Sequence, residues 1–210
     1  MGLRETKAEK TRTRIVREAL LLFKRDGYEQ TSVEAIAEAA EVSPSTLYRY
    51  FPSKDLILLS PVSAYDFWEA FSRHAVNHPA EEALAEAILD WAKWQDSNAE
   101  EVLLVRSLID QAPIPRARLW DVVYQSERDL NARLAEKLHL PEDDLKVVLS
   151  ARLAFLVIGL VADLWRASAG KSSSVAIAKK VMRMFEEHKV LLPQIPPRRC
   201  AHLDDSARSK

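Results

Sequence analysis

The chain has 210 residues, of which 48% are hydrophobic and only four are glycine, a composition typical of a helical protein with a sizeable core. Its formal net charge is −1, so the chain as a whole offers no electrostatic attraction to nucleic acid. Its single cysteine, Cys200, excludes an intrachain disulfide and fits a reducing cytoplasm.

Neither a signal peptide nor a membrane span is expected. The N-terminus is charged and lacks the apolar segment of a signal peptide. The most apolar run, residues 153–165, is too short to span a bilayer and is expected to form a buried helix. We therefore expect a cytoplasmic protein with no membrane partner.

The N-terminal end is basic although the chain is neutral. Residues 1–25 contain eight lysines and arginines against three glutamates, an excess of five positive charges. Such a local excess is an electrostatic footprint for nucleic acid, whereas a solvated tail is the simpler alternative.

Short helices are expected first along the chain. An apolar face at i, i+4, i+7 and i+8 predicts a first helix that Gly27 ends, carried by Ile15, Ala19, Leu22 and Phe23. Thr31 and Glu34 match a capping box that opens a second, short helix. Ser43 caps a third helix with Pro44 at its first position, and Ser53 caps a fourth.

Longer helices follow, and no strand pattern persists, so the expected fold class is all-α. The expected helices cover residues 61–77, 80–96, 99–111, 116–139, 142–168 and 173–191. Residues 193–210 are rich in proline and charge and are expected to be a disordered tail. The expected domains are residues 1–58, a unit of short helices with a basic arm, and 59–192, a unit of longer helices.

The stretch "SPSTLYRYFPSK", residues 43–54, collects short hydroxyls and tyrosines on a helix that has little to bury. In a helix-turn-helix the second helix enters the major groove and its N-terminal residues meet base edges. Ser45 and Thr46 can contact base edges, and Arg49 can pair with guanine or phosphate. The tyrosine hydroxyls and the Lys54 amine suit phosphate oxygens.

Residues 11–58, "TRTRIVREALLLFKRDGYEQTSVEAIAEAAEVSPSTLYRYFPSKDLIL", resemble the DNA-binding domain of the TetR family of bacterial repressors. The resemblance implies an all-helical homodimer that binds a palindromic double-stranded operator and is released by a small molecule in its C-terminal domain. Matched position by position, it implies DNA contacts from Ser32, Val33, Ser43, Pro44, Ser45, Thr46, Tyr48, Arg49, Tyr50 and Lys54. The basic arm before Ile15 would lie near the DNA backbone or minor groove.

Two features depart from the family pattern. Glu41 stands where the family usually has glycine in the turn, and a positive φ there costs about 1 kcal/mol. Residues 26–48 hold five acids and no basic residue, and Glu34, Glu38 and Glu41 are expected on one face that points away from DNA. Glu34 near the helix start can also accept from cytosine, although a solvated face is the simpler interpretation.

Aromatic residues gather beyond residue 60, a pattern that suits an apolar ligand cavity, and the family resemblance favours such an effector cavity between helices. The alternative for any one of them is ordinary core packing. The predicted ligand-binding residues are Trp68, Phe71, Trp91, Trp94, Arg106, Trp120, Tyr124 and Phe155. Asp163 lies within an apolar helix and either serves the ligand or pairs with Arg166.

The segment "LSARLAFLVIGLVADLW" is apolar nearly all round, more than one buried stripe requires. Together with the last helix it predicts a homodimer surface, and a central helix of the monomer is the alternative. The predicted interface residues are Leu156, Gly159, Leu160, Val181 and Phe185. Ser60 and Pro61 are expected to start a new helical segment, and we hypothesise that Pro61 is the hinge for effector response.

No metal or cofactor is predicted. His74 and His78 have the i, i+4 spacing of zinc ligands, but no clear cysteine or carboxylate cluster accompanies them. An enzyme is disfavoured because the sequence has no phosphate loop, nucleophile elbow or acid–base pair. A DNA-binding regulator whose C-terminal domain only dimerises or binds a protein stays open beside a regulator with a lipophilic effector.

Overall fold

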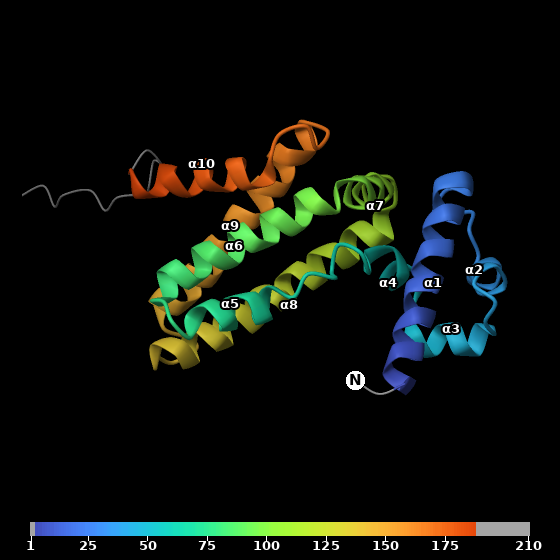
Figure 1. The fold of residues 1–210 in the computed structure, drawn as a ribbon, viewed down its shortest axis with the longest axis horizontal. Helices are drawn as coiled ribbons and strands as arrows, with labels where there is room; N and C mark the ends of the chain where they lie inside the picture. Colours follow the sequence, from blue (N-terminus) through green and yellow to red (C-terminus); the bar gives the residue numbers. More distant parts are fainter. Residues whose placement is uncertain (1–2, 188–210) are drawn as a thin grey trace, which may run out of the picture.

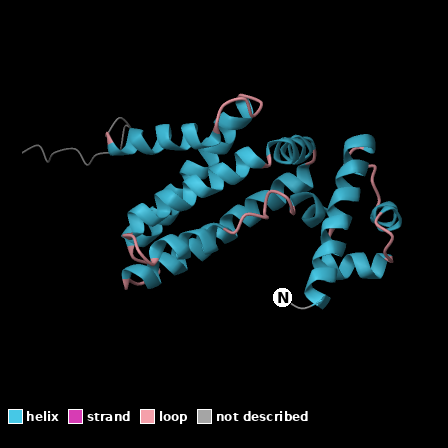
Figure 2. Cartoon of the chain, in the orientation of Figure 1, coloured by secondary structure: helices cyan, strands magenta, loops and turns pink. Residues whose placement is uncertain are grey.

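A computed structural model describes residues 3–187, which are helical and contain no strand (Figure 2). The predicted all-α fold class is therefore confirmed. The helices are α1 (Leu3–Asp26), α2 (Val33–Ala39), α3 (Pro44–Tyr50), α4 (Lys54–Leu59), α5 (Phe67–Ala75), α6 (Ala80–Ser97), α7 (Ala99–Gln111), α8 (Pro113–Leu138), α9 (Leu145–Ala167) and α10 (Ser174–Glu186). The predicted disordered tail lies outside the described residues.

Helices α1 to α4 gather at one end of the molecule, and the remaining helices form a longer bundle (Figure 1). The first core is built from buried side chains of α1 to α4, including Phe23, Ile36, Leu47 and Ile57. It continues into α7 through Val105 and neighbouring residues. The expected boundary at residue 58 therefore crosses a shared core, and the two parts are held together by packing.

The ends of the short helices follow the expected signals with one correction. Gly27 ends α1 with φ +88°, and its N–H donates to the carbonyl of Phe23 at 3.0 Å. The predicted cap at Thr31 is wrong, because its hydroxyl instead donates to the carbonyl of Gly27 at 2.8 Å. Ser32 is the N-cap of α2 and accepts from the Ala35 N–H at 3.0 Å.

The turn between α2 and α3 closes through a residue with positive φ, although that residue is not glycine. Glu41 has φ +50°, and the Val42 N–H reaches back to the carbonyl of Ala37 at 2.9 Å. This bond belongs to a Schellman cap, in which the residue after the helix adopts the left-handed conformation. Glu41 therefore lies beyond α2. The prediction that it shares a helical face with Glu34 and Glu38 is wrong.

The predicted helix over 61–77 is wrong in its first turn and a half. Ser60 is the C-cap of α4, and Pro61 lies in a turn instead of starting a helix. Helix α5 begins at Phe67, where the Asp66 carboxylate accepts from the Glu69 N–H at 2.9 Å. Conversely, the expected break at Pro113 is the first position of α8, where a residue without an N–H is tolerated.

Helix α9 is long and apolar enough, by length and composition alone, to cross a membrane. The expectation that its apolar run is too short is thus corrected, because the run belongs to a helix of 23 residues. The helix buries one side against α6, α8 and α10. The residues on that side are small, namely Val147, Ala151, Ala154, Val157 and Val161, with Trp165 at the end.

A charged network joins α5 to α6. The Asp90 carboxylate accepts from His74 Nε2 at 2.8 Å, from Lys93 at 2.9 Å and from Arg73 at 3.0 Å. Burial would raise the pKa of Asp90, but these hydrogen bonds outweigh it and lower the pKa to about 2. His74 is thus engaged here while His78 faces Glu82, and the described residues hold no cluster of three metal-ligating side chains.

Replacing Asp90 with asparagine should lower the free energy of unfolding at pH 7 by on the order of 1 kcal/mol. The melting temperature should fall accordingly. Because the folded pKa lies below the unfolded value of 3.8, the stabilisation exists above that value and is lost as pH falls toward about 2. Melting curves by circular dichroism between pH 7 and pH 3 measure both effects. An equal decline of wild type and variant with pH would contradict the role of this network.

Candidate DNA-binding interface and ligand cavity

The N-terminal end of α3 presents a group of exposed hydroxyls. Ser43 is the N-cap, and its oxygen accepts from the Thr46 N–H at 3.1 Å and lies 3.0 Å from the Ser45 hydroxyl. Pro44 occupies the first helical position and is exposed. The Ser43 hydroxyl therefore caps the helix start, and these short side chains allow close approach of another surface.

The middle of α3 separates an anchoring side from an outward side. Leu47 and the following Phe51 are buried in the first core. Tyr48 is 47% exposed and Arg49 is exposed, while Tyr50 is half-buried with the Arg49 guanidinium 5.6 Å from its ring centre. An exposed tyrosine with no hydrogen-bond partner among the described residues leaves its hydroxyl free for another molecule.

Lys54 is placed differently from the sequence expectation of a free phosphate-binding amine. Its Nζ donates to the carbonyls of Tyr28 at 2.7 Å and Thr31 at 2.9 Å, and lies 4.3 Å from the Tyr28 ring centre. Burial lowers the pKa of Lys54, and Glu29 acts in the opposite direction. In this structure the amine fastens the α1–α2 loop to the start of α4.

The basic end of the chain is part of α1 and not a separate extended arm. Helix α1 runs from Leu3, so the basic segment continues the same helix that packs in the first core. The Arg12 guanidinium lies 4.4 Å from the centre of the Phe51 ring. Arg14 pairs with Glu41 at 3.3 Å, which ties α1 to the turn before α3.

Ser32 and Val33 lie at the start of α2, and Ser32 is exposed while Val33 is half-buried. The Ser32 hydroxyl is already used as a cap, so it combines a structural role with an exposed position. The structure therefore brings all ten predicted DNA-contacting residues to the α2, α3 and α4 segments, with Lys54 turned inward.

A cavity of about 450 Å³ opens between α6, α7, α8 and α9, bordered by the turn after α4. Five of the eight predicted ligand-binding residues line it, namely Trp91, Trp94, Arg106, Trp120 and Phe155. The predicted ligand-binding set omits Tyr65, Phe67 and Trp165, which also belong to the aromatic lining. The first two lie near a segment wrongly assigned to a long helix, so their facing was not deducible.

Three predicted ligand residues lie elsewhere. Phe71 is only 2% exposed and packs in the second core, with the edge of Trp68 against its ring at 6.3 Å. Tyr124 is on the outer side of α8 and is 59% exposed. Helical spacing placed Trp120 and Tyr124 on one face, but only the first reaches the cavity rim.

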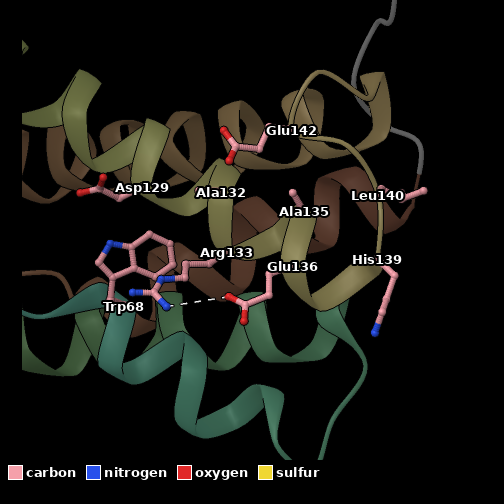
Figure 3. A pocket seen from close by; sticks show the side chains of 9 residues that line it. All are labelled: Trp68, Asp129, Ala132, Arg133, Ala135, Glu136, His139, Leu140 and Glu142. Carbon is pink, nitrogen blue, oxygen red and sulfur yellow. Dashed lines mark ion pairs between the residues drawn. The ribbon is translucent and has the colours of Figure 1, made fainter.

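Trp68 belongs to an open groove of about 820 Å³ near the far end of α8 (Figure 3). Arg133 lies beside the Trp68 ring and pairs with Glu136 at 3.9 Å, while His139 points outward (Figure 3). The groove is lined mainly by exposed polar side chains whose charges are already partly matched. It offers little apolar surface to a ligand.

One ion pair connects the two parts of the molecule. Asp55 in the first turn of α4 is only 6% exposed, and its carboxylate accepts from Arg118 Nε of α8 at 3.0 Å. Arg118 also lies 3.6 Å from Asp121. Helix α8 supplies Leu119 and Trp120 to the cavity directly after Arg118, so the cavity wall and this ion pair share one helical turn.

The predicted dimer residues divide between exposed and buried positions. Leu156, Gly159 and Leu160 are exposed on α9. Val181 is only 5% exposed and packs in the core of its own subunit, and Phe185 is half-buried against the same core. Val181 therefore packs inside its own subunit and not on the predicted dimer surface, because α10 turns its apolar face toward α6 and α9.

The exposed side of α9 carries large side chains where its buried side carries small ones. Six leucines follow one another at helical spacing and are each at least 43% exposed: Leu145, Leu149, Leu153, Leu156, Leu160 and Leu164. We call this row the α9 leucine stripe. Contiguous exposed apolar surface of this kind marks an interaction site on a soluble protein.

Comparison with known proteins places the N-terminal segment in a regulatory family. Residues 15–60 match the family model of "Bacterial regulatory proteins, tetR family". The transcriptional regulator TcmR of Streptomyces glaucescens is 51% identical over 81 residues, which are 39% of this chain and 35% of TcmR. The repressor KstR of Rhodococcus jostii is 46% identical over 52 residues, which are 25% of this chain and 24% of KstR.

The matched regions therefore span about a third or less of these relatives' lengths. The similarity of fold is wider than that of sequence. The crystal structure of FadR from Thermus thermophilus, a transcriptional repressor in complex with lauroyl-CoA, is 25% identical with a TM-score of 0.55. That comparison covers 89% of this chain and 98% of FadR. With the helix-turn-helix geometry and the helical bundle behind it, these similarities support a transcriptional regulator of the TetR family, whose model matches residues 15–60.

Proposed function

We propose that this protein is a sequence-specific DNA-binding repressor, released from a palindromic operator by a small apolar or aromatic effector in the cavity between α6, α7, α8 and α9. The observation that carries the proposal is the outward end of α3. Its short hydroxyls, Tyr48 and Arg49 face away from the core, while Leu47 and Phe51 anchor the helix. This arrangement suits insertion into a major groove.

Charge near α3 supports the same proposal. Arg49 is exposed, and the basic α1 extends beside the same unit. Glu34 and Glu38 are exposed on α2, and Glu41 is paired with Arg14. Matching one acid of the turn with an arginine reduces the repulsion that these carboxylates would exert on phosphate.

A homodimer built on the α9 leucine stripe would present two copies of α3. Palindromic sites require recognition helices about 34–36 Å apart along the DNA, one helical turn. Burying six leucines against a second copy removes a large apolar area from water at about 25 cal/mol per Å². The stripe thus gives a reason for the dimer that the family resemblance implies.

Effector binding would act through α8. An occupied cavity displaces the wall formed by Leu119 and Trp120, and Arg118 on the same turn holds Asp55 of α4. Movement of α4 is transmitted to α3 through the first core, and the buried Pro61 in the following turn is the proposed hinge. Ligand would then favour the state with wrongly spaced recognition helices.

The cavity favours this proposal over a regulator whose C-terminal domain only dimerises or binds a protein. Its volume of about 450 Å³ and its aromatic walls are typical of small-molecule sites. The related repressor from Thermus thermophilus was crystallised with lauroyl-CoA. An enzymatic role is disfavoured because the matched relatives are transcriptional regulators.

Replacing Tyr48 with phenylalanine removes one exposed hydroxyl and should weaken operator binding about threefold to tenfold without changing stability. Fluorescence anisotropy with the DNA that flanks the protein's own gene, against scrambled DNA at about 0.15 M salt, measures the change. Tyr124→Phe is the matched control, an exposed tyrosine on α8. Equal affinity for both DNAs would refute the proposal. Lys54 is a poorer probe, because its replacement also frees two carbonyls.

Replacing Leu156 and Leu160 together with glutamate should convert the dimer to a monomer. Four like charges would otherwise be buried at the two-fold interface, at a cost of several kcal/mol. Sedimentation velocity should show twice the 23.8 kDa chain mass for the wild type and a single chain for the variant. Leu21→Glu, an equally exposed leucine on α1, should remain dimeric. A double variant that stays dimeric would place the interface elsewhere.

Replacing Arg118 with methionine should uncouple the two parts of the molecule, because the buried Asp55 carboxylate loses its partner at about 1–3 kcal/mol. All five tryptophans lie beyond residue 60, so their fluorescence follows the C-terminal bundle while circular dichroism follows every helix. In urea the two signals should change together in the wild type and separately in Arg118→Met.

Adding Asp55→Asn to Arg118→Met should restore part of the lost stability, because the uncompensated charge is removed. Arg128→Met, which replaces an exposed arginine on the same helix, is the control for loss of charge alone. Coincident transitions in Arg118→Met at an unchanged urea midpoint would show that this ion pair does not connect the domains.

A further inference from the structure

The charges of the cavity do not balance. Its lining contains three arginines and two aspartates, and its other lining residues are uncharged. Both aspartates are engaged by one arginine, since Arg166 pairs with Asp110 at 2.7 Å and with Asp163 at 2.8 Å. Arg106 of α7 and Arg116 of α8 are therefore the cavity arginines that have no carboxylate partner in the described part of the chain, and they carry its surplus positive charge.

Arg106 is the more enclosed of these two arginines. It is half-buried, whereas Arg116 is exposed. Among residues 3–187 no hydrogen bond or ion pair satisfies its guanidinium, although Asp110 stands one helical turn further along α7. A partly desolvated guanidinium without an acceptor is costly, because it loses part of its hydration without gaining a partner.

Electrostatics at Arg106 agree with this geometry. Burial lowers the pKa of Arg106 and the nearby Arg166 lowers it further, whereas Asp110 and Asp163 act in the opposite direction. The side chain nevertheless stays protonated, because the reference pKa of arginine is so high. A fixed cation thus remains at the cavity wall in every state of the protein at neutral pH.

Two further donors of the cavity wall are unsatisfied. Trp165 is fully buried, and its Nε1 has no acceptor among the described residues. Arg166 Nε is also buried without a partner, although its terminal nitrogens are paired. The walls around these donors are aromatic, with Trp91, Trp94 and Phe155 among them. Two buried donors of the lining residues therefore lack an acceptor within the described structure, in a cavity that is otherwise largely apolar.

We propose that the effector is an amphipathic organic anion, with a planar apolar body between the aromatic walls and an oxyanion that accepts hydrogen bonds from Arg106. The inference rests on the proposed effector role of this cavity and narrows the chemical class of the ligand. A neutral lipophilic molecule would fill the same volume but leave the guanidinium unpaired. A carboxylate accepts two parallel N–H bonds from an arginine fork, which makes it the best match.

Two matched probes test the charge requirement on the full-length protein. The probes are 9-anthracenecarboxylate and 9-anthracenecarboxamide, which share the tricyclic body and differ in charge. Isothermal titration calorimetry should show that the wild type binds the carboxylate at least about tenfold more tightly than the amide, as expected for a hydrogen bond to a charged group. Addition of the carboxylate should also release labelled operator DNA in the anisotropy assay.

Arg106→Met keeps the length of the side chain and removes its charge and donors. It should weaken carboxylate binding about tenfold and leave amide binding within about twofold. Arg106→Lys, which keeps the charge but not the fork, should retain an intermediate preference. Arg128→Met should behave as the wild type. Unchanged melting temperatures would show that the variants are folded.

The outcomes separate this inference from the proposed function. Equal wild-type affinity for the two probes, or an unchanged preference in Arg106→Met, would overturn the anion requirement and leave the cavity as an effector site. Binding of neither probe would overturn the inference together with the effector role for planar aromatic molecules. The anisotropy measurements without probe decide DNA binding independently of both.

Discussion

The buried Asp55 carboxylate constrains how this molecule is assembled. A charge that is only 6% exposed requires a partner, and the described structure supplies one in Arg118 of α8. Helix α4 is thereby held against the C-terminal bundle at one defined position, while Ile57, Leu58 and Leu59 on the same helix complete the first core. The orientation of α3 depends on this anchor, because α3 and α4 share that core. A movement of α8 near the cavity would therefore shift α4 and, through the shared core, α3, the helix proposed to read DNA.

Helix α9 solves two packing problems with its two sides. Small residues such as Ala151 and Ala154 face the subunit core and allow close approach of neighbouring helices. The leucine stripe on the other side would be costly in a monomer and stabilising in a dimer. Such an apolar helix, long enough by length and composition to cross a membrane, thus has one face covered by its own subunit and one face proposed to bind a second copy.

The arginine network of the cavity links charge to ligand choice. Arg166 neutralises Asp110 and Asp163 and joins α7 to α9, so the aspartates stabilise the wall and are not free to serve Arg106. This division explains why a cation persists in a largely apolar cavity. It also separates two roles that sequence spacing could not separate, since Asp110 lies at i+4 from Arg106 and would have been its expected partner.

The sequence by itself determined the all-α fold, the short N-terminal helices and the outward side of α3, because capping residues and helical periodicity act over a few positions. It also indicated Glu41 as a residue of positive φ and Arg106 as a polar group of the cavity. Only the tertiary structure decided which aromatic side chains meet. Phe71 and Tyr124 do not line the cavity, whereas Tyr65 and Trp165 do. Likewise, only the tertiary structure shows that Lys54 points inward, that Val181 is buried, and that Asp55 pairs with Arg118, 63 positions away. These outcomes depend on how helices cross and on which charges compete for one partner, and neither is encoded in local spacing.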